Sequence, residues 1–164
     1  MPYAALRTSL LAARDERQAL LDSLFPAGAP TTLMLSLNLP GTRKTGAPAR
    51  RLFDWGERAL LAALPALPLL RGSDQLGPFG IYRSEGDPRE AKRRAIGVES
   101  GQPAGRLLDI DIYDASGRQV DRSGLGLPPR GCLVCPEPAL SCMRAGRHDS
   151  DALMARAQEL IDAL

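Results

Sequence analysis

Residues 107–113 read Leu-Leu-Asp-Ile-Asp-Ile-Tyr, and their strict alternation of apolar and polar side chains predicts a β-strand with one buried face. Successive side chains of a strand point to opposite faces, so the aliphatic residues from Leu108 to Ile112 face the core, whereas Asp109 and Asp111 share the other face. The two aspartates are about 7 Å apart along the backbone by strand geometry. This stretch therefore predicts a strand that packs one face against the core and carries two carboxylates on the other face.

Turn and strand patterns extend from this stretch in both directions. Residues 114–117 predict a turn, so that residues 118–122 return as the second strand of a hairpin. Apolar residues recur at helical spacing over residues 4–23, 48–64 and 150–164, and they alternate as in a strand over residues 31–39. Short strands are expected at residues 79–83 and 94–100, a proline- and glycine-rich linker at residues 65–78, and a solvated helix face at the charged residues 14–18. These elements predict a single α+β domain over residues 1–164, with a mixed or antiparallel sheet flanked by helices.

Composition excludes several classes of protein. With 44% hydrophobic and 24% charged residues, the chain has the composition of a soluble globular protein. No window approaches the roughly 18 uncharged apolar residues that a membrane span needs. The first residues show no secretion signal, so we expect a cytoplasmic protein with no membrane partner. A net charge of +2 and the absence of aromatic residues interleaved with basic ones argue against nucleic acid as a partner.

Arginine dominates the basic residues, since Lys44 and Lys92 are the only lysines among 21 basic side chains. A guanidinium pairs with phosphate oxygens in a bidentate way, so the bias is consistent with phosphate recognition, although codon usage explains it equally well. The polar loop at residues 40–46 contains Lys44 and could hold phosphate through backbone amides. It lacks the order of a Walker loop, and a surface loop without a ligand is the alternative.

The paired aspartates are candidate ligands of a divalent cation. Adjacent carboxylates repel each other, and a bound cation is one feature that offsets this repulsion. Mg²⁺ takes one or two carboxylates together with the phosphate oxygens of a substrate. Because Arg106, Arg118 and Arg122 flank the pair, the pattern favours a site for metal and phosphate, and a solvated strand face is the alternative.

All three cysteines and the only histidine lie within 17 positions, as Cys132-x2-Cys135-x6-Cys142-x5-His148. This spacing predicts a Cys3His zinc knuckle near the C-terminus. Such a site has four protein ligands and no open position, so it would stabilise the fold and would prevent His148 from acting as a base. Buried thiols with a solvent-facing histidine, or a redox-active or nucleophilic cysteine, are the alternatives.

Three motifs together carry a family resemblance. They are G-R-L-x-D-I-D-[IV] at residues 105–112, L-P-P-R-x-C-L-x-C at residues 127–135 and C-x-R-x-x-x-H at residues 142–148, supported by residues 14–19 and 39–53. The chain resembles the citrate lyase holo-acyl-carrier-protein synthases, a family of phosphoribosyl-dephospho-CoA transferases. The resemblance covers most of the chain, apart from residues 65–102.

The resemblance implies a reaction and a partner. The 2'-(5''-phosphoribosyl)-3'-dephospho-CoA group would pass from its triphosphoribosyl donor to a serine of the apo acyl carrier protein, the γ subunit of citrate lyase, with release of pyrophosphate. This is nucleotidyl transfer, and the related malonate decarboxylase transferases suggest a nucleotidyltransferase-like fold. That fold usually has a Gly-Ser pair on a helix before its carboxylates, whereas Ser100-Gly101 lies too close to them and in reverse order. The third carboxylate of such a site is unassigned, and Asp121 is the nearest candidate.

The sequence therefore supports a leading hypothesis and two alternatives. We expect a magnesium-dependent transferase with these site residues: Asp109, Asp111, Arg106 and Arg122 as catalytic residues, Lys44, Arg51, Arg118 and Arg130 as substrate-binding residues, Asp109 and Asp111 as Mg²⁺ ligands, and Cys132, Cys135, Cys142 and His148 as ligands of a structural Zn²⁺. One alternative is a non-enzymatic, zinc-stabilised basic module that binds a protein or a nucleic acid. The other is a family member that only binds the carrier protein.

Overall fold

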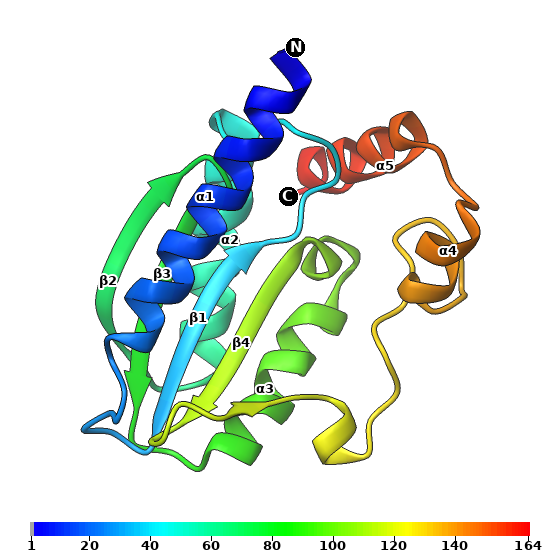
Figure 1. The fold of residues 1–164 in the computed structure, drawn as a ribbon. Helices are drawn as coiled ribbons and strands as arrows, with labels where there is room; N and C mark the ends of the chain where they lie inside the picture. Colours follow the sequence, from blue (N-terminus) through cyan, green and yellow to red (C-terminus); the bar gives the residue numbers. More distant parts are fainter. Residues whose placement is uncertain (1) are drawn as a thin grey trace.

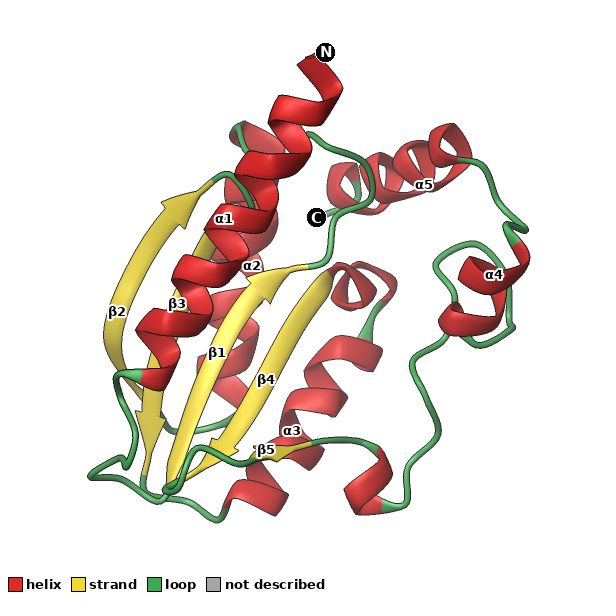
Figure 2. Cartoon of the chain, in the orientation of Figure 1, coloured by secondary structure: helices red, strands yellow, loops and turns green. Residues whose placement is uncertain are grey.

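An antiparallel sheet of five strands, in the order β2-β3-β1-β4-β5, is the centre of the fold in residues 2–164, the part of the chain that the computed structural model describes (Figure 1). The strands are β1 (Thr31–Leu37), β2 (Leu67–Asp74), β3 (Gly77–Ser84), β4 (Leu108–Asp114) and β5 (Gln119–Val120). The helices are α1 (Pro2–Asp22), α2 (Ala47–Ala63), α3 (Pro88–Gly101), α4 (Ala139–Ala145) and α5 (Ser150–Asp162), with short 3-10 turns η1 (Pro103–Leu107) and η2 (Ser123–Leu125). Figure 2 shows the same elements by type. The prediction of one α+β domain with helices around a sheet is confirmed.

The two faces of the sheet are covered differently. On one face, the aliphatic side chains of β1 and β4 pack with α2, α3 and α5 in the main core, where Leu35, Leu52 and Ile110 are fully buried. On the other face, a smaller cluster joins Leu21 of α1 to Met34 of β1. In Figure 1, α1 lies across β1 and β3 on this second face, and the β4 side of that face is left uncovered by α1.

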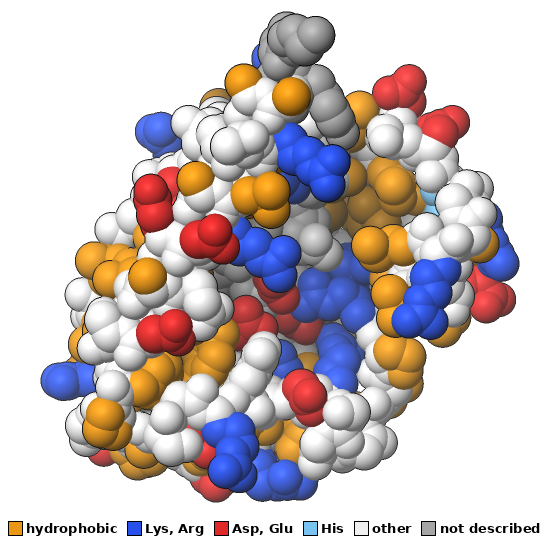
Figure 3. All heavy atoms as spheres, viewed as in Figure 1, with side chains coloured by type: hydrophobic (Ala, Val, Ile, Leu, Met, Phe, Trp, Pro, Cys, Tyr) orange, Lys and Arg blue, Asp and Glu red, His pale blue; other side chains and the backbone are white. Residues whose placement is uncertain are grey.

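The uncovered part of the second face is where the aspartates of β4 lie. In the register of β4 against β1, Asp111 is opposite Met34 and Asp109 is opposite Ser36. The space-filling view shows a hollow between α1 and the C-terminal segment, with acidic side chains at its base and basic side chains around them (Figure 3). The sheet therefore presents the predicted carboxylate pair on an accessible face.

Most predicted elements are confirmed, and two are wrong. Residues 94–100, expected as a strand, belong to α3. The N-cap of this helix is Asp87, whose side chain accepts a hydrogen bond from the Glu90 N–H. The buried face of this helix includes Lys92 and Glu99, and these charges concealed its periodicity. Residues 65–78, expected as a linker, contain β2. This exposed edge strand pairs with β3 although it contains Pro68. Within the described residues, no helix has the length and apolar character needed to cross a bilayer.

Arg17 ties α1 to the hairpin of β2 and β3. Its guanidinium donates two hydrogen bonds to the Asp74 carboxylate and one to the Gly77 carbonyl, each of 2.6 Å. It also lies 4.3 Å from the centre of the Phe79 ring, and only 8% of the residue is exposed. The expectation of a solvated face for residues 14–18 is therefore wrong at Arg17, whereas its neighbours in the segment are exposed.

Replacing Arg17 with Met is expected to lower the free energy of unfolding by about 3 kcal/mol, because the Asp74 carboxylate would lose its cationic partner in a mostly buried position. A urea titration followed by circular dichroism measures this change. Arg14→Met is the matched control, since Arg14 is exposed on the same helix and its replacement should change stability by less than about 0.5 kcal/mol. Equal effects of the two substitutions would contradict the anchoring role of Arg17.

Candidate functional site

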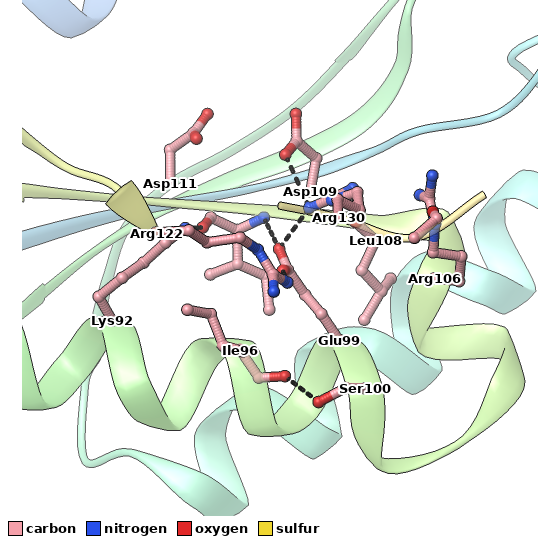
Figure 4. Close-up of polar contacts among 12 residues, drawn as sticks. Lys92, Ile96, Glu99, Ser100, Arg106, Leu108, Asp109, Asp111, Arg122 and Arg130 are labelled. Atoms are coloured by element: carbon pink, nitrogen blue, oxygen red, sulfur yellow. Dashed lines mark hydrogen bonds and ion pairs between the residues drawn. The ribbon is translucent and has the colours of Figure 1, made fainter. Parts of the chain in front are cut away.

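The carboxylates of Asp109 and Asp111 project from the same face of β4, away from α3 (Figure 4). Asp111 accepts a 2.7 Å hydrogen bond from Nε2 of Gln119 on β5. The Asp109 side chain is 45% exposed, and its Oδ1 lies 3.3 Å from Nη2 of Arg130. The shared face predicted from alternation is confirmed, and the pair stands beside a guanidinium.

The surroundings of Asp111 disfavour its charged form. Burial raises the pKa of this carboxyl, the negative charge of Asp109 raises it further, and together they bring it to about 6. The positive charges of Lys92 and Arg130 act in the opposite direction but are outweighed. A carboxylate pair that is electrostatically strained in this way is a suitable ligand set for a cation.

The edge of β4 next to the aspartates is covered by side chains instead of a strand. The short strand β5 pairs only with Ile112 and Tyr113, so it ends before this part of β4. Here the Ile110 N–H donates to Glu99 Oε1 at 2.9 Å, and Lys92 Nζ donates to the Ile110 carbonyl at 2.7 Å. The buried charges of α3 thus satisfy the backbone groups that a longer β5 would have paired.

Glu99 also holds the two arginines that lie nearest to the aspartates. Its Oε1 accepts a 2.7 Å hydrogen bond from Nη2 of Arg130, and its Oε2 accepts one of 2.9 Å from Nη2 of Arg122. Nη1 of Arg130 donates to the Leu108 carbonyl at 2.9 Å. Figure 4 shows both guanidinium groups converging on Glu99 from beyond the edge of β4. Arg130 therefore lies between two carboxylates, those of Glu99 and Asp109.

The two buried charged residues of α3 were not predicted from the sequence. Lys92 and Glu99 are only 5% and 4% exposed, and their spacing of seven residues places them on one helix face. That spacing was the available signal, but it carries meaning only once residues 94–100 are recognised as helical. Asp121, the nearest candidate for a third carboxylate, lies in the turn at η2, where its Oδ1 accepts from the Gly124 N–H and the Ser123 hydroxyl.

Of the other predicted basic residues near the pair, Arg106 lies in the pocket with Arg122 and Arg130, whereas Arg118 lies outside it. Arg106 on η1 donates from Nε to the Gly131 carbonyl, and burial together with the charge of Arg130 lowers the pKa of Arg106. It lies on the same side of β4 as the arginines held by Glu99, and the three line one pocket. Arg118 is exposed on the hairpin after the turn at Asp114, outside that pocket.

Among the described residues, no hydrogen bond or ion pair joins Lys44 or Arg51 to the aspartates. Nζ of Lys44 donates to the Leu39 carbonyl within its own loop, and burial lowers the pKa of this ammonium. Arg51 is exposed on α2, which packs on the opposite face of the sheet. Ser100, which was compared with the Gly-Ser pair of nucleotidyltransferases, donates to the Ile96 carbonyl at the end of α3, so it does not lie at the start of a helix.

The cysteines and the histidine converge as predicted. The ligand atoms of Cys132, Cys135, Cys142 and His148 all lie within 4.8 Å of one another. Sγ of Cys135 is 3.4 Å from Sγ of Cys142 and 3.3 Å from Nε2 of His148. A tetrahedral zinc with bonds of about 2.3 Å to sulfur separates its sulfur ligands by about 3.8 Å, so the cluster needs only a small adjustment to hold a metal ion.

The contacts of Cys132 favour the ionised form that a metal ligand needs. The Cys132 N–H donates to the Glu137 carbonyl at 2.7 Å, and this contact closes the loop that contains the first two cysteines. Burial raises the pKa of the Cys132 thiol, but hydrogen bonds from the N–H groups of Val134 and Cys135, together with those to the Cys142 and Cys135 side chains, outweigh this effect and lower it to about 6. Burial raises the pKa of the Cys142 thiol. Metal binding requires a thiolate, so the donor set is consistent with a metal ion.

Two pockets meet at Arg106. One, of about 300 Å³, is mostly apolar and lies against the cysteine cluster, with Leu107, Leu133, Met143 and Leu153 in its wall. The other, of about 370 Å³, lies at the edge of β4 and is lined by Glu99, Arg122 and Arg130 among others. An apolar and a cationic cavity therefore share Arg106, and Arg130 in the wall of the cationic one lies 3.3 Å from Asp109.

Comparisons with known proteins agree with the resemblance inferred from the motifs. A family model described as apo-citrate lyase phosphoribosyl-dephospho-CoA transferase matches residues 6–164. A protein of that name from Citrobacter koseri is 34% identical over 164 residues, covering 97% of this chain and 90% of the relative. Proteins of the same name from Escherichia coli O139:H28 and Shigella boydii serotype 18 are each 32% identical over 165 residues, covering 98% of this chain and 90% of the relatives.

Proposed function

The chain belongs to the family of apo-citrate lyase phosphoribosyl-dephospho-CoA transferases, and we propose that Asp109 and Asp111 form the centre at which it carries out the family's reaction. It is a transferase that attaches the phosphoribosyl-dephospho-CoA prosthetic group to the apo acyl carrier protein of citrate lyase. The observation that carries the proposed centre is the pair of carboxylates on one open face of β4, with the pKa of Asp111 raised to about 6 and Arg130 beside Asp109.

The donor in this proposal is 2'-(5''-triphosphoribosyl)-3'-dephospho-CoA, and the acceptor is a serine of the γ subunit. The serine oxygen forms a bond to the α-phosphorus, and the bond from that phosphorus to the oxygen of the β-phosphate breaks. Pyrophosphate leaves with the bonding electrons, and the hydroxyl proton passes to a base or to solvent. Such a reaction depends on positioning and charge stabilisation far more than on a covalent nucleophile of the enzyme.

In this proposal the aspartates and the arginines of the site have different roles. The carboxylates of Asp109 and Asp111 would hold Mg²⁺, which when bound neutralises phosphate charge and aligns the polyphosphate. Arg130 stands close enough to Asp109 to contact a phosphate at the same centre. Arg106 and Arg122 lie further along the edge of β4, where they supply positive charge to the rest of the chain of phosphates.

The second proposed metal is a structural Zn²⁺ in the cluster of Cys132, Cys135, Cys142 and His148. With four protein ligands it would have no open position, so it would hold the segment in place without taking part in the transfer. His148 would then be a ligand and not the base that accepts the serine proton. Gly131, which directly precedes the first cysteine of the cluster, accepts a hydrogen bond from Arg106 through its carbonyl. A bound zinc would therefore also help to hold Arg106 in place.

The alternative of a basic binding module is not favoured by the geometry. A module that binds a polyanion through its surface presents its basic residues outward on one face. Here Arg122 and Arg130 turn toward Glu99 and border a pocket next to a carboxylate pair. This arrangement suits a small phosphorylated ligand.

Mass spectrometry of the apo carrier protein tests the proposal. After incubation with the enzyme, the triphosphoribosyl donor and Mg²⁺, we expect the carrier to gain the mass of one phosphoribosyl-dephospho-CoA group. Omission of Mg²⁺, or replacement of the acceptor serine with alanine, should leave the carrier unmodified. An unmodified carrier in the complete mixture, with the carrier still bound to the enzyme, would instead indicate a protein that only binds its partner.

A further inference from the structure

The cationic pocket at the edge of β4 is built around a buried acid. Arg106, Arg122 and Arg130 line it, together with Glu99 and the turn at Gln102 and Pro103. Glu99 is only 4% exposed, although it carries a charge. A buried carboxylate is costly unless it is paired, and this one is paired with two guanidinium groups and one backbone N–H.

The arginines of this pocket retain donors for a further anion. A guanidinium has five N–H donors in a planar fork, which matches the oxygen atoms of a phosphate. Among the contacts of the described residues, the side chain of Arg122 uses Nη2 for Glu99 alone. The side chain of Arg106 uses Nε for the Gly131 carbonyl. Both arginines can therefore bind an anion without giving up their existing partners.

Arg130 connects this pocket to the aspartate pair. Its Nη2 lies 2.7 Å from Glu99 Oε1 and 3.3 Å from Asp109 Oδ1, so one guanidinium borders both places. A phosphate chain whose α-phosphorus lies at the aspartates would pass Arg130 as it enters the pocket. The neighbouring pocket beyond Arg106 is lined mostly by apolar side chains, so it is unsuited to a highly charged group.

We propose that the pocket at the edge of β4 is the subsite for the pyrophosphate that leaves during the transfer, and that Glu99 is the positioning residue for its arginines. This inference rests on the proposed function. As the bond from the α-phosphorus to the bridging oxygen breaks, the electron pair goes to the pyrophosphate. The N–H groups of Arg122 and Arg130 face that developing charge, so they stabilise the transition state more than the bound donor.

Product inhibition by inorganic pyrophosphate in the presence of Mg²⁺ tests the subsite in Arg122→Gln. We expect the inhibition constant of pyrophosphate to rise roughly 10- to 100-fold, the effect of one charge-assisted contact. We expect kcat to fall more than KM for the donor rises, whereas inhibition by dephospho-CoA stays the same. Arg93→Gln is the matched control, since Arg93 is half exposed on the solvent side of α3 and should leave all three constants unchanged.

Glu99→Gln tests the positioning role separately. Glutamine retains the size of the side chain and an acceptor for the Ile110 N–H, but it removes the charge that holds both guanidinium groups. We expect weaker inhibition by pyrophosphate and unchanged inhibition by dephospho-CoA. Tighter binding of pyrophosphate in this variant would overturn the positioning role, because Glu99 would then only reduce the positive charge of the pocket.

The pyrophosphate subsite and the aspartate centre can be tested independently of each other. Unaltered inhibition by pyrophosphate in an active Arg122→Gln enzyme removes the subsite but leaves the aspartate centre intact. Normal transfer by Asp109→Asn removes the centre itself. Thermal unfolding of each variant shows whether a lost activity reflects a lost fold.

Discussion

Asp109→Asn and Asp111→Asn are each expected to lower the rate of prosthetic-group transfer by about a thousandfold while the fold remains intact. Asparagine has nearly the shape of aspartate but lacks the charge that holds a divalent cation. A loss of about 4 kcal/mol of transition-state stabilisation, a reasonable value for a metal ligand, corresponds to about a thousandfold in rate. Single-turnover transfer to the apo carrier protein, measured with saturating donor and Mg²⁺, gives this rate directly.

The stability of Asp111→Asn provides an independent check of the same site. The pKa of Asp111 in the folded protein is raised from 3.8 to about 6, so in the absence of metal the carboxylate opposes folding increasingly as the pH rises from 4 to 6, and fully above pH 6. The substitution should therefore stabilise the metal-free protein at pH 8 by roughly 1 to 2 kcal/mol. This gain should decrease between pH 6 and pH 4 and vanish below it, where the carboxyl is protonated in both states.

Asp54→Asn is the matched control for both measurements, because Asp54 is an exposed aspartate on α2, on the other face of the sheet. It should change neither the rate nor the pH dependence of stability. Normal turnover in Asp109→Asn or Asp111→Asn would rule out the metal assignment. A stability loss in Asp111→Asn at pH 8 would show that the carboxylate has a favourable partner in the folded protein.

Loss of the proposed zinc is also expected to have a large effect, on both the stability of the protein and the rate of transfer. Protein purified without chelator should contain about one zinc per chain by elemental analysis, and Cys135→Ser should contain almost none. Because structural zinc sites contribute many kcal/mol to folding, we expect the variant to unfold at a temperature lower by roughly 10 °C. Transfer should fall strongly as well, since the segment that carries Arg130 and Gly131 adjoins the cluster.

At moderate temperature, loss of the proposed zinc should unfold only the segment around the cysteine cluster. The residues Ala157, Leu160 and Ile161 of α5 pack in the main core independently of the cluster, so the sheet and α5 should remain folded. Limited proteolysis should then cut the variant between residues 131 and 149 and spare the rest. Val134→Ser, at an exposed position between two of the ligands, is the control. Full stability of the native protein with less than a tenth of a zinc per chain would contradict the structural role.

The sequence was sufficient to predict those features of the site that depend only on the local geometry of a short segment. The alternation at residues 107–113 predicted the shared face of Asp109 and Asp111, and the spacing of the cysteines predicted a cluster that closes in space. Both features depend on the geometry of a short segment. The motifs that contain them also predicted the family, which the comparisons confirm.

The sequence was insufficient where a charge is buried by tertiary contacts. Glu99 and Lys92 have the appearance of exposed helix residues, because nothing near them in the chain indicates that they meet the edge of β4. Arg17 is hidden for the same reason, since its partner Asp74 lies 57 residues away. The contact of Lys44 with the carbonyl of Leu39 in its own loop is likewise invisible in the sequence pattern. Pairings of this kind are decided by the fold as a whole.

The edge of β4 has a consequence for the behaviour of the protein in concentrated solution. An unpaired strand edge is a template for intermolecular pairing and aggregation, and folds protect such edges with charges placed against them. Lys92, Glu99 and Arg130 occupy the backbone groups of Ile110 and Leu108 that a strand from another molecule would need. The residues that line this edge for an anion therefore also prevent its pairing with a strand of another molecule. Variants with substitutions in the pocket should be checked for self-association before any loss of activity is interpreted.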